Sequence, residues 1–446
     1  MKKSFNRNHL IVMSLGNIIG SGIFLGSSTV ISVAGPAAVL AYLFGGVLMA
    51  FEVTFITEMC VINPAPGAFR VHASEVFGPW MGFVNGWMFW CSGVLGMASE
   101  VAAAAMFTRF WLPQVPQWVL CLLYAGIMAL INLCDLKGLS RIEGGLASVK
   151  VIALVLFVLV GLLTLLHIVR FGQLRPTNPF SSVTTFFPHG LAGVFASMIM
   201  VMFSYTGTGI IGLAVADTED PGKNAPPAVA VISTVVIVLY VLSILFLVLL
   251  SPQGGFSTTA SPYVEILRRL HIPYSDDILN FIVLTAALSG LNSSMYSSSR
   301  MLSSLGRDGL APRAFSKISR NGVPVLALLT GSGALLLTAI LSYLIPSTVF
   351  IILATASGFL AMFNWLTISV THYFYRKKTL KTQPEKLRYK APGYPYSSFG
   401  LAAAIIALFC TSPLYPGQFS GLVGSVVLLA ALVACYFILK KTDRIR

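Results

Sequence analysis

The sequence predicts an all-α integral membrane protein with twelve transmembrane helices, and three observations carry this prediction. Of its 446 residues, 56% are hydrophobic and only 10% are charged, whereas soluble domains carry roughly 25% charged residues. Apolar stretches of about 20 residues, the length that crosses a bilayer, recur along the whole chain. Lysine and arginine gather in alternate connecting segments, as they do in multi-span proteins. Together these features exclude a cytosolic enzyme, a secreted protein and a disordered scaffold.

Twelve apolar stretches are predicted to span the bilayer. Several exceed about 25 residues, which indicates tilt or a break rather than a straight perpendicular helix. The first is interpreted as a retained span, because it is longer than the roughly 7–15 apolar residues of a signal peptide. The predicted spans are residues 10–33, 37–59, 80–107, 117–134, 142–169, 186–215, 226–250, 278–304, 323–344, 348–374, 397–411 and 418–439.

The distribution of basic residues predicts the orientation of the chain. An even number of spans puts both termini on one side, and 24 of the 29 lysine and arginine residues fall on that side. By the positive-inside rule, the N-terminus (1–9) and the C-terminal tail (440–446) are cytoplasmic. The formal charge of +14 is therefore an orientation signal rather than a sign of nucleic-acid binding. The basic connection 376–396 is predicted to be a cytoplasmic loop that contacts lipid.

Motifs that would indicate another class of membrane protein are absent from the sequence. It has no GxxxxGK[ST] phosphate-binding loop, no HExxH zinc motif and no GxSxG nucleophile elbow, which leaves ATP-driven transport and hydrolysis unsupported. No span carries the regularly spaced arginines of a voltage sensor, and no TVGYG filter occurs. We therefore expect a secondary transporter that is not an enzyme and that uses no metal and no cofactor.

Two spans contain a Gly-x-Gly motif near mid-membrane depth. Gly20-Ser21-Gly22 lies in the first span and Gly207-Thr208-Gly209 in the sixth, five helices later and in the opposite direction. This pattern is typical of inverted repeats with discontinuous helices. A break frees N–H groups that bind a carboxylate and carbonyls that bind an ammonium, so the pair predicts a site for a zwitterionic amino acid. Close helix packing by small residues is the alternative.

Several motifs resemble one family. They are Asn17-Ile-Ile-Gly-Ser-Gly-Ile-Phe-Leu-Gly26, Asn63-Pro-Ala-Pro-Gly-Ala-Phe69, Gly78-Pro-Trp-Met-Gly-Phe-Val-Asn-Gly-Trp87, Phe203-Ser-Tyr-Thr-Gly207, Asn292-Ser-Ser-Met-Tyr-Ser-Ser-Ser-Arg-Met-Leu302 and Asp308-Gly-Leu-Ala-Pro312. They are similar to the bacterial amino acid transporter branch of the amino acid–polyamine–organocation superfamily. The resemblance implies a LeuT-like fold with two inverted five-helix repeats, 10–170 and 186–375. The loop 376–396 and two further helices (397–439) would follow.

The resemblance also implies which residues bind the substrate. Its carboxylate would lie on backbone amides near Ser21 and Gly22, and its ammonium on carbonyls of Ile18, Phe203 and Thr206. Phe203 would close over the side chain of the bound substrate, and Phe89 would gate the inner end of the binding site. Core packing remains the alternative for both rings. The full predicted substrate-binding set is Ile18, Gly20, Ser21, Gly22, Ser92, Gly93, Met97, Phe203, Thr206 and Gly207.

Ionisable residues inside predicted spans are costly and therefore expected to be functional or paired. They include Glu52, Glu100, Glu143 and Lys150. The resemblance places Lys150 where sodium-coupled relatives bind sodium, with Ser289 as a hydroxyl partner, and matches Glu100 to a family glutamate. Lys150, Ser289 and Glu100 form the predicted proton-coupling set. A structural tether for Lys150 and an ion pair for Glu100 are the alternatives. Glu52 has no counterpart in the family and no assigned role.

The expected substrate follows from a departure from the family pattern. Many relatives carry a glutamate two residues after Gly207, and this chain has Gly209, while Asp217 replaces a second glutamate conservatively. This favours neutral, medium-sized aliphatic amino acids. The predicted function is a proton-coupled amino acid permease with alternating access, in the cell membrane of a bacterium. An obligate exchanger and a non-transporting sensor are the alternatives. The expected partners are the amino acid, the proton and the lipid bilayer, and the oligomeric state is left open.

Overall fold

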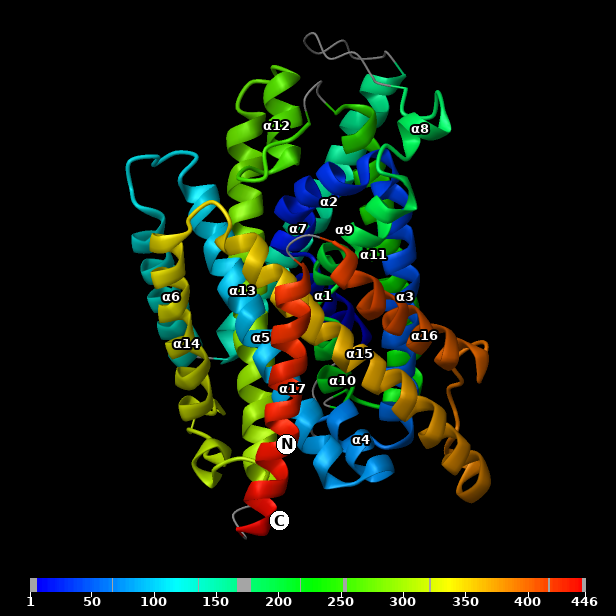
Figure 1. The fold of residues 1–446 in the computed structure, drawn as a ribbon. Helices are drawn as coiled ribbons and strands as arrows, with labels where there is room; N and C mark the ends of the chain where they lie inside the picture. The colour runs from blue at the N-terminus through cyan, green and yellow to red at the C-terminus, as the bar shows by residue number, and fades with distance from the viewer. Residues whose placement is uncertain are drawn as a thin grey trace.

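The computed structural model describes residues 6–65, 67–134, 136–166, 178–216, 218–251, 255–320, 322–415 and 418–442. These residues form a bundle of helices (Figure 1). The helices are α1 (Arg7–Ile18), α2 (Ser27–Ala34), α3 (Ala38–Ile62), α4 (Phe69–Phe77), α5 (Pro79–Thr108), α6 (Gln117–Cys134), α7 (Leu136–Leu165), α8 (Val183–Phe186), α9 (Gly190–Ser204), α10 (Gly209–Ala216), α11 (Pro221–Leu249), α12 (Pro262–Arg269), α13 (Ser275–Arg307), α14 (Val325–Leu344), α15 (Val349–Thr382), α16 (Tyr396–Thr411) and α17 (Gln418–Lys441).

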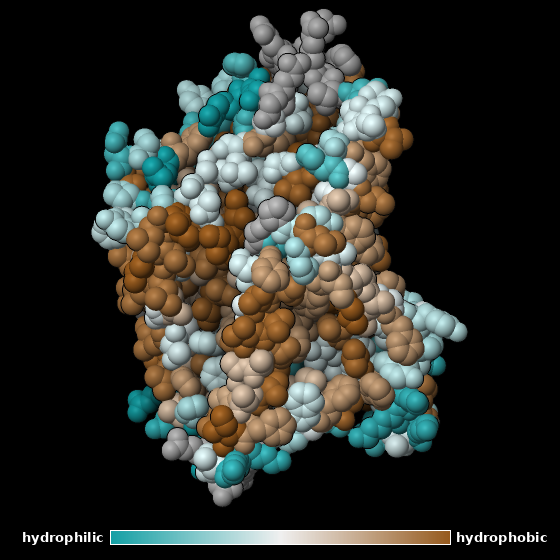
Figure 2. Space-filling view, in the orientation of Figure 1, coloured by the Kyte–Doolittle hydropathy of each residue, from teal (hydrophilic) through white to brown (hydrophobic). Residues whose placement is uncertain are grey.

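The helices have the length and polarity of membrane spans. In the described part of the chain, ten helical stretches are long and apolar enough to cross a bilayer. One of them, Arg7–Ile62, covers the first two predicted spans, and the shorter apolar helix Gln117–Leu133 corresponds to the fourth. Figure 2 shows an apolar belt between two hydrophilic ends. The prediction of a helical membrane protein is therefore confirmed, while the count of twelve spans stays a prediction.

The two ends of the chain lie towards the same side of the bundle. In Figure 1 both termini lie in the half that contains α4, and α8 and α12 lie at the opposite end. This agrees with an even number of spans. That this side is cytoplasmic stays a prediction from the distribution of basic residues.

Both predicted helix breaks are present. The first span ends its first half at Ile18, passes through the extended residue Ile19 and resumes in a π-helical turn, Gly22–Gly26, that leads into α2. The sixth span is interrupted between α9 and α10. There, Gly207 has a φ of +94°, a backbone conformation that glycine adopts far more readily than other residues. The two breaks lie at the centre of the bundle.

The polar end that carries the termini contains more helix than predicted. The helix α15 continues to Thr382, seven residues past the predicted end of the second repeat at 375. The first part of the predicted loop 376–396 is therefore helical. Lysine, leucine and threonine in this stretch are compatible with a helix, but the stretch is too polar to be recognised as part of a membrane span. The short helix α4 at this end, and α12 at the opposite end, were likewise not predicted, because a search for spans does not detect short polar helices.

Candidate functional site

The two helix breaks face each other and are joined by side chains. Asn17, in the last turn of α1, donates from Nδ2 to the Gly207 carbonyl at 2.6 Å. The Tyr240 hydroxyl of α11 lies 3.1 Å from the Ile18 carbonyl and 3.3 Å from the Ser204 carbonyl. The last carbonyls of a helix lack intrahelical partners and need donors from elsewhere. One tyrosine therefore serves the ends of both broken helices.

The Ser21 amide, predicted to bind the substrate carboxylate, donates to a carboxylate of the protein. Both oxygens of Glu100 lie 3.1 Å from Ser21 N. Gly20 and Gly290 make room for this carboxylate, because a Cβ on either glycine would lie 2.4 Å or 2.9 Å from Glu100 Oε1. The first break is thus an anion-binding site, as helix N-termini commonly are.

Gly22 has a packing role. A Cβ at this position would lie 2.6 Å from Cα of Ser204 at the end of α9, a distance that no side chain tolerates. The close helix packing held open as an alternative for the Gly-x-Gly motif therefore applies to Gly22. The same motif provides an anion-binding amide at Ser21 and a close helix contact at Gly22.

Lys150 reaches the first break from α7. The side chain is fully buried, and Nζ donates to the Gly16 carbonyl at 2.7 Å. A cation near the C-terminal end of a helix is favourable, because the carbonyls there carry partial negative charge. Lys150 also lies close enough to Glu100 for their charges to interact. Ser289 Oγ is buried and has no hydrogen-bond partner among the described residues, so the predicted pairing with Lys150 is not formed.

Two small cavities adjoin the breaks. The first cavity, about 30 Å³, lies between the breaks and is lined by residues that include Ile18, Glu100 and Phe203. The second cavity, about 60 Å³, lies beside α10 and is lined by residues of α3, α5, α13 and α15. The residues common to both linings are Asn17, Gly96, Thr206, Gly207 and Ser294. Both cavities are far smaller than the roughly 300–1,000 Å³ of pockets for drug-sized ligands.

Comparison with known proteins agrees with this architecture. The family described as Amino acid permease matches residues 9–442. The chain belongs to the amino acid permease family. It is 34% identical over 443 residues to the gamma-aminobutyric acid permease of Bacillus subtilis (strain 168), covering 97% of this chain and 93% of the relative. It is also 33% identical over 404 residues to the amino-acid permease RocC of the same organism, with 89% and 85% covered. The D-serine/D-alanine/glycine transporter of Escherichia coli (strain K12) is 32% identical over 401 residues, with 88% and 84% covered.

Most of the predicted binding residues of this permease meet at the two cavities. Ile18, Gly20, Gly22 and Phe203 line the first cavity. Ser92, Gly93 and Phe89 line the second, and Thr206 and Gly207 line both. Ser21 contributes its amide from just outside the first cavity.

Met97 belongs to the predicted binding set but lines neither cavity. Ser92, Gly96 and Glu100 follow one another at four-residue spacing and share a face of α5. Met97 follows Phe89 and Gly93 at the same spacing and lies one turn beyond them. Its Cε faces Gly331 of α14, 3.3 Å from where a Cβ there would lie. Its role in substrate binding stays a prediction. Asp217 lies outside the described residues, as does the side chain of Glu143.

The two predicted gating rings belong to different cavities. Phe203 packs edge-on against Phe350 with 6.2 Å between the ring centroids. Phe89 packs edge-on against Phe69 at 5.3 Å, and a Cβ at Gly209 would lie 2.5 Å from its ring. The absence of a side chain at 209 therefore allows Phe89 to close one wall of the second cavity.

Sequence reasoning assigned no role to several polar side chains in the second cavity. Its lining includes Glu52 of α3, Asn17 of α1, Thr208 of the second break and Asn364 of α15. Glu52 stood out in the sequence as a carboxylate inside an apolar span. Nothing in the sequence indicates that the other three converge with it, because this depends on the rotation of four separate helices.

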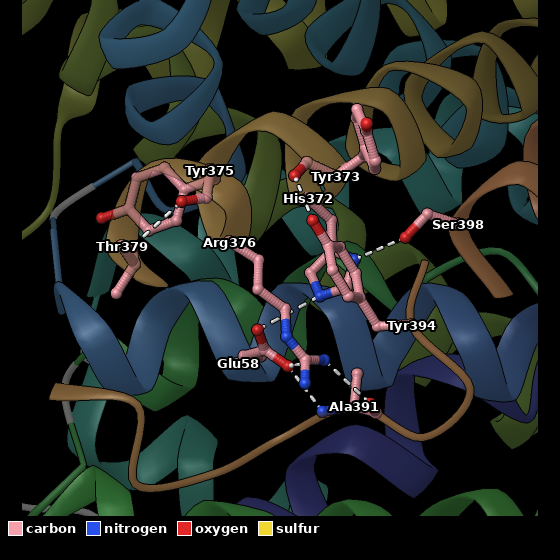
Figure 3. A network of polar contacts seen from close by, with 9 residues as sticks. All are labelled: Glu58, His372, Tyr373, Tyr375, Arg376, Thr379, Ala391, Tyr394 and Ser398. Atoms are coloured by element: carbon pink, nitrogen blue, oxygen red, sulfur yellow. Dashed lines mark hydrogen bonds and ion pairs between the residues drawn. The ribbon is translucent and has the colours of Figure 1, made fainter. Parts of the chain in front are cut away.

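A second polar network closes the end of the permease that carries the termini (Figure 3). The fully buried Glu58 of α3 accepts hydrogen bonds from Arg376 Nη1 at 3.2 Å and from the Ala391 amide at 2.5 Å. His372 Nε2 lies 3.3 Å from the other carboxylate oxygen. The segment between α15 and α16, predicted as a lipid-contacting loop, is therefore fastened to α3.

Proposed function

We propose that this permease moves zwitterionic amino acids across the cell membrane together with protons, by alternating access. The observation that carries the proposal is the Ser21 amide, which donates to the Glu100 carboxylate in the first break. A backbone donor that holds one carboxylate also suits the carboxylate of a substrate. The names of the relatives, which specify gamma-aminobutyric acid and D-serine, D-alanine and glycine, support a zwitterionic substrate.

Competition between the substrate carboxylate and Glu100 for the Ser21 amide would couple proton uptake to substrate binding. When the substrate carboxylate takes the Ser21 N–H, Glu100 loses that donor and would be left as a buried charge, which is costly. A proton taken up on the Glu100 carboxylate removes the charge. Release of the substrate on the other side returns the amide to Glu100, which gives up the proton there. One substrate and one proton then cross together.

Lys150 would have a role both with and without bound substrate in this scheme. Its ammonium holds the Gly16 carbonyl at the end of α1 and offsets the charge of the nearby Glu100. The tether fixes the first half of the broken helix, while the second halves α2 and α10 would move between the two access states. Motion of half-helices around a fixed central site is the usual form of alternating access.

The membrane arrangement is part of the proposal. Ten apolar helical stretches, one of which covers two predicted spans, and the additional helix Gln117–Leu133 support twelve spans. The opposite directions of the two broken spans support inverted repeats at 10–170 and 186–375, followed by two further helices within 397–439. The basic residues support cytoplasmic termini.

Transport by the purified protein in proteoliposomes tests the proposal. Labelled γ-aminobutyrate, alanine, serine and leucine are offered with and without an imposed pH gradient, and counterflow is measured in parallel. We expect accumulation of at least one of them when the outside is acidic. Counterflow without any gradient-driven accumulation would instead identify an obligate exchanger and overturn proton coupling.

Glu100→Gln separates coupling from binding. Glutamine retains an oxygen that accepts from Ser21 N but has no group that titrates at these pH values. We expect counterflow to persist while gradient-driven accumulation is lost. Glu75→Gln is the control, because this exposed carboxylate of α4 lies outside both cavities. Wild-type accumulation by Glu100→Gln would exclude Glu100 as the coupling group.

A further inference from the structure

The second cavity is lined by buried oxygens that have no partner. Glu52 is 1% exposed, Thr208 0%, Asn364 3% and Asn17 8%. Both carboxylate oxygens of Glu52, Oγ1 of Thr208 and the Oδ1 atoms of both asparagines have no hydrogen-bond partner among the described residues. Buried polar atoms are paired in the great majority of cases, so such a group requires an explanation.

These groups offer mainly acceptors to a ligand, because each asparagine amide already donates one hydrogen bond. Asn17 Nδ2 donates to the Gly207 carbonyl at 2.6 Å, and Asn364 Nδ2 donates to the Leu360 carbonyl at 3.2 Å. The amide oxygens have no partner and remain for a ligand, together with one N–H of each amide. An ionised Glu52 accepts and does not donate. The Thr208 hydroxyl approaches the carboxylate without reaching hydrogen-bond geometry.

A cluster of acceptors with one negative charge suits a cation that donates hydrogen bonds. The lining of the second cavity contains no lysine or arginine that could neutralise Glu52. An isolated buried carboxylate is strongly disfavoured unless a cation or a proton compensates it. A primary ammonium carries one positive charge and three donors, which matches the single carboxylate and the three neutral oxygens.

The second cavity also lies where the far end of a substrate would reach. It shares Asn17, Thr206 and Gly207 with the first cavity, which adjoins the carboxylate-binding amide of Ser21. A chain that starts on that amide therefore extends towards Glu52.

We propose that Glu52, Thr208, Asn17 and Asn364 form a subsite for the ammonium group at the far end of an amino acid substrate. This proposal rests on the proposed function and specifies its substrate class. The sequence analysis expected an amino acid with an aliphatic side chain, on the basis of Gly209. The subsite instead favours an amino acid that carries an amine several bonds away from its carboxylate. When that amine is its only one, the molecule stays zwitterionic without net charge.

The carboxylate of this cavity lies on α3, at Glu52, rather than on α10 for a steric reason. A Cβ at Gly209 would lie 2.5 Å from the Phe89 ring, so α10 has no room for an acidic side chain at that position while Phe89 is in place. Glu52 reaches the same cavity from the neighbouring helix α3. The counter-charge that the sequence lacks at 209 is therefore supplied by another span.

Isosteric ligand pairs test the subsite with the purified full-length protein. Ornithine and norleucine have equally long side chains that differ only in the terminal ammonium, and γ-aminobutyrate and pentanoate form a second such pair. Affinities are measured by calorimetry in sodium-free N-methyl-glucamine buffer. We expect the ammonium member of at least one pair to bind about tenfold or more tightly, as hydrogen bonds to a charged group require.

Substitutions in the second cavity test whether its side chains cause this difference in affinity. Glu52→Gln should reduce the preference within the pair by about tenfold or more, and Asn364→Leu should reduce it to a lesser degree. Asn85→Leu is the matched control, because Asn85 is also buried with an unpartnered amide but lies outside both cavities. It should leave the preference unchanged.

The alternative occupants of the cavity give distinct results. Equal binding within both pairs by the wild-type protein would overturn the subsite while leaving amino acid transport intact. Sodium-dependent norleucine binding that Glu52→Gln abolishes would assign the oxygens to an inorganic cation and overturn it as well. Loss of gradient-driven transport in Glu52→Gln with an unchanged preference would make Glu52 a proton carrier instead. Failure of every amino acid to bind would overturn the proposed function and the subsite together.

Discussion

The Lys150 ammonium donates to the Gly16 carbonyl at 2.7 Å and so joins α7 to the last turn of α1. The contact is fully buried on the lysine side. It occurs two residues before the first helix break, where carbonyls begin to lose their helical partners. This geometry supports the tether interpretation of Lys150 more directly than a role in carrying protons.

The first prediction concerns this tether. Lys150→Met keeps the length of the side chain and removes the charge and the donors. Because α1 then loses its anchor in every state, we expect counterflow and gradient-driven accumulation to fall together, by about tenfold or more, as for loss of a charged hydrogen bond. The deciding quantity is the ratio of accumulation to counterflow. A selective loss of accumulation would show that Lys150 itself carries the proton.

Local sequence features predicted the helix breaks, and the assembly of the site depended on tertiary structure. Gly20 and Gly207 lie in short motifs whose backbone freedom is a local property, so their breaks could be found by inspection. The direction of Met97 depends on how α5 is rotated against α14, which the sequence does not encode locally. Glu52 could be singled out as a costly charge in an apolar span. Its neighbours in the cavity, Thr208 and Asn364, could not, because they lie 156 and 312 positions further along the chain.

The second prediction concerns the network around Glu58. Glu58→Gln removes the charge that faces Arg376, and breaking a buried ion pair costs roughly 3–5 kcal/mol. We expect a clearly lower melting temperature in detergent. We also expect faster tryptic cleavage after Arg388, because the Ala391 amide loses its charged acceptor. Lys378→Gln, at an exposed position of the same helix α15, is the control. Equal melting temperatures for Glu58→Gln and the wild type would contradict the structural role of the network.

The third prediction concerns pH. Burial lowers the pKa of His72 in α4 to about 4, although its hydrogen bond to the Asn63 carbonyl opposes the shift. Because the ordinary pKa is about 6.5, the unfolded chain binds this proton more readily than the folded one. The stabilisation is therefore complete above pH 6.5 and is lost as the pH falls towards 4, by about 3 kcal/mol in total.

A non-titrating substitution reveals this contribution. His72→Gln keeps an N–H donor for Asn63 and removes the titration. Between pH 7.5 and pH 4.5, the melting temperature of the wild-type protein should fall more steeply than that of the variant. Parallel curves would exclude His72 as a source of acid sensitivity.

The last prediction compares two carboxylates on the same helix. Glu52 and Glu58 both lie on α3 and are 1% and 0% exposed, but Glu58 has charged partners and Glu52 has none among the described residues. A buried carboxyl group without a partner destabilises the fold, either as an unpaired charge or through the cost of taking up a proton, so a site that waits for a cation weakens the empty protein. Glu52→Gln replaces the carboxyl group with a neutral amide of nearly the same shape. We expect the ligand-free variant to melt at a higher temperature than the wild type, the opposite of Glu58→Gln, while ornithine or γ-aminobutyrate stabilises it less. A fall in melting temperature for both variants would mean that Glu52 has a structural partner in the folded protein and that the second cavity is not built for a cation.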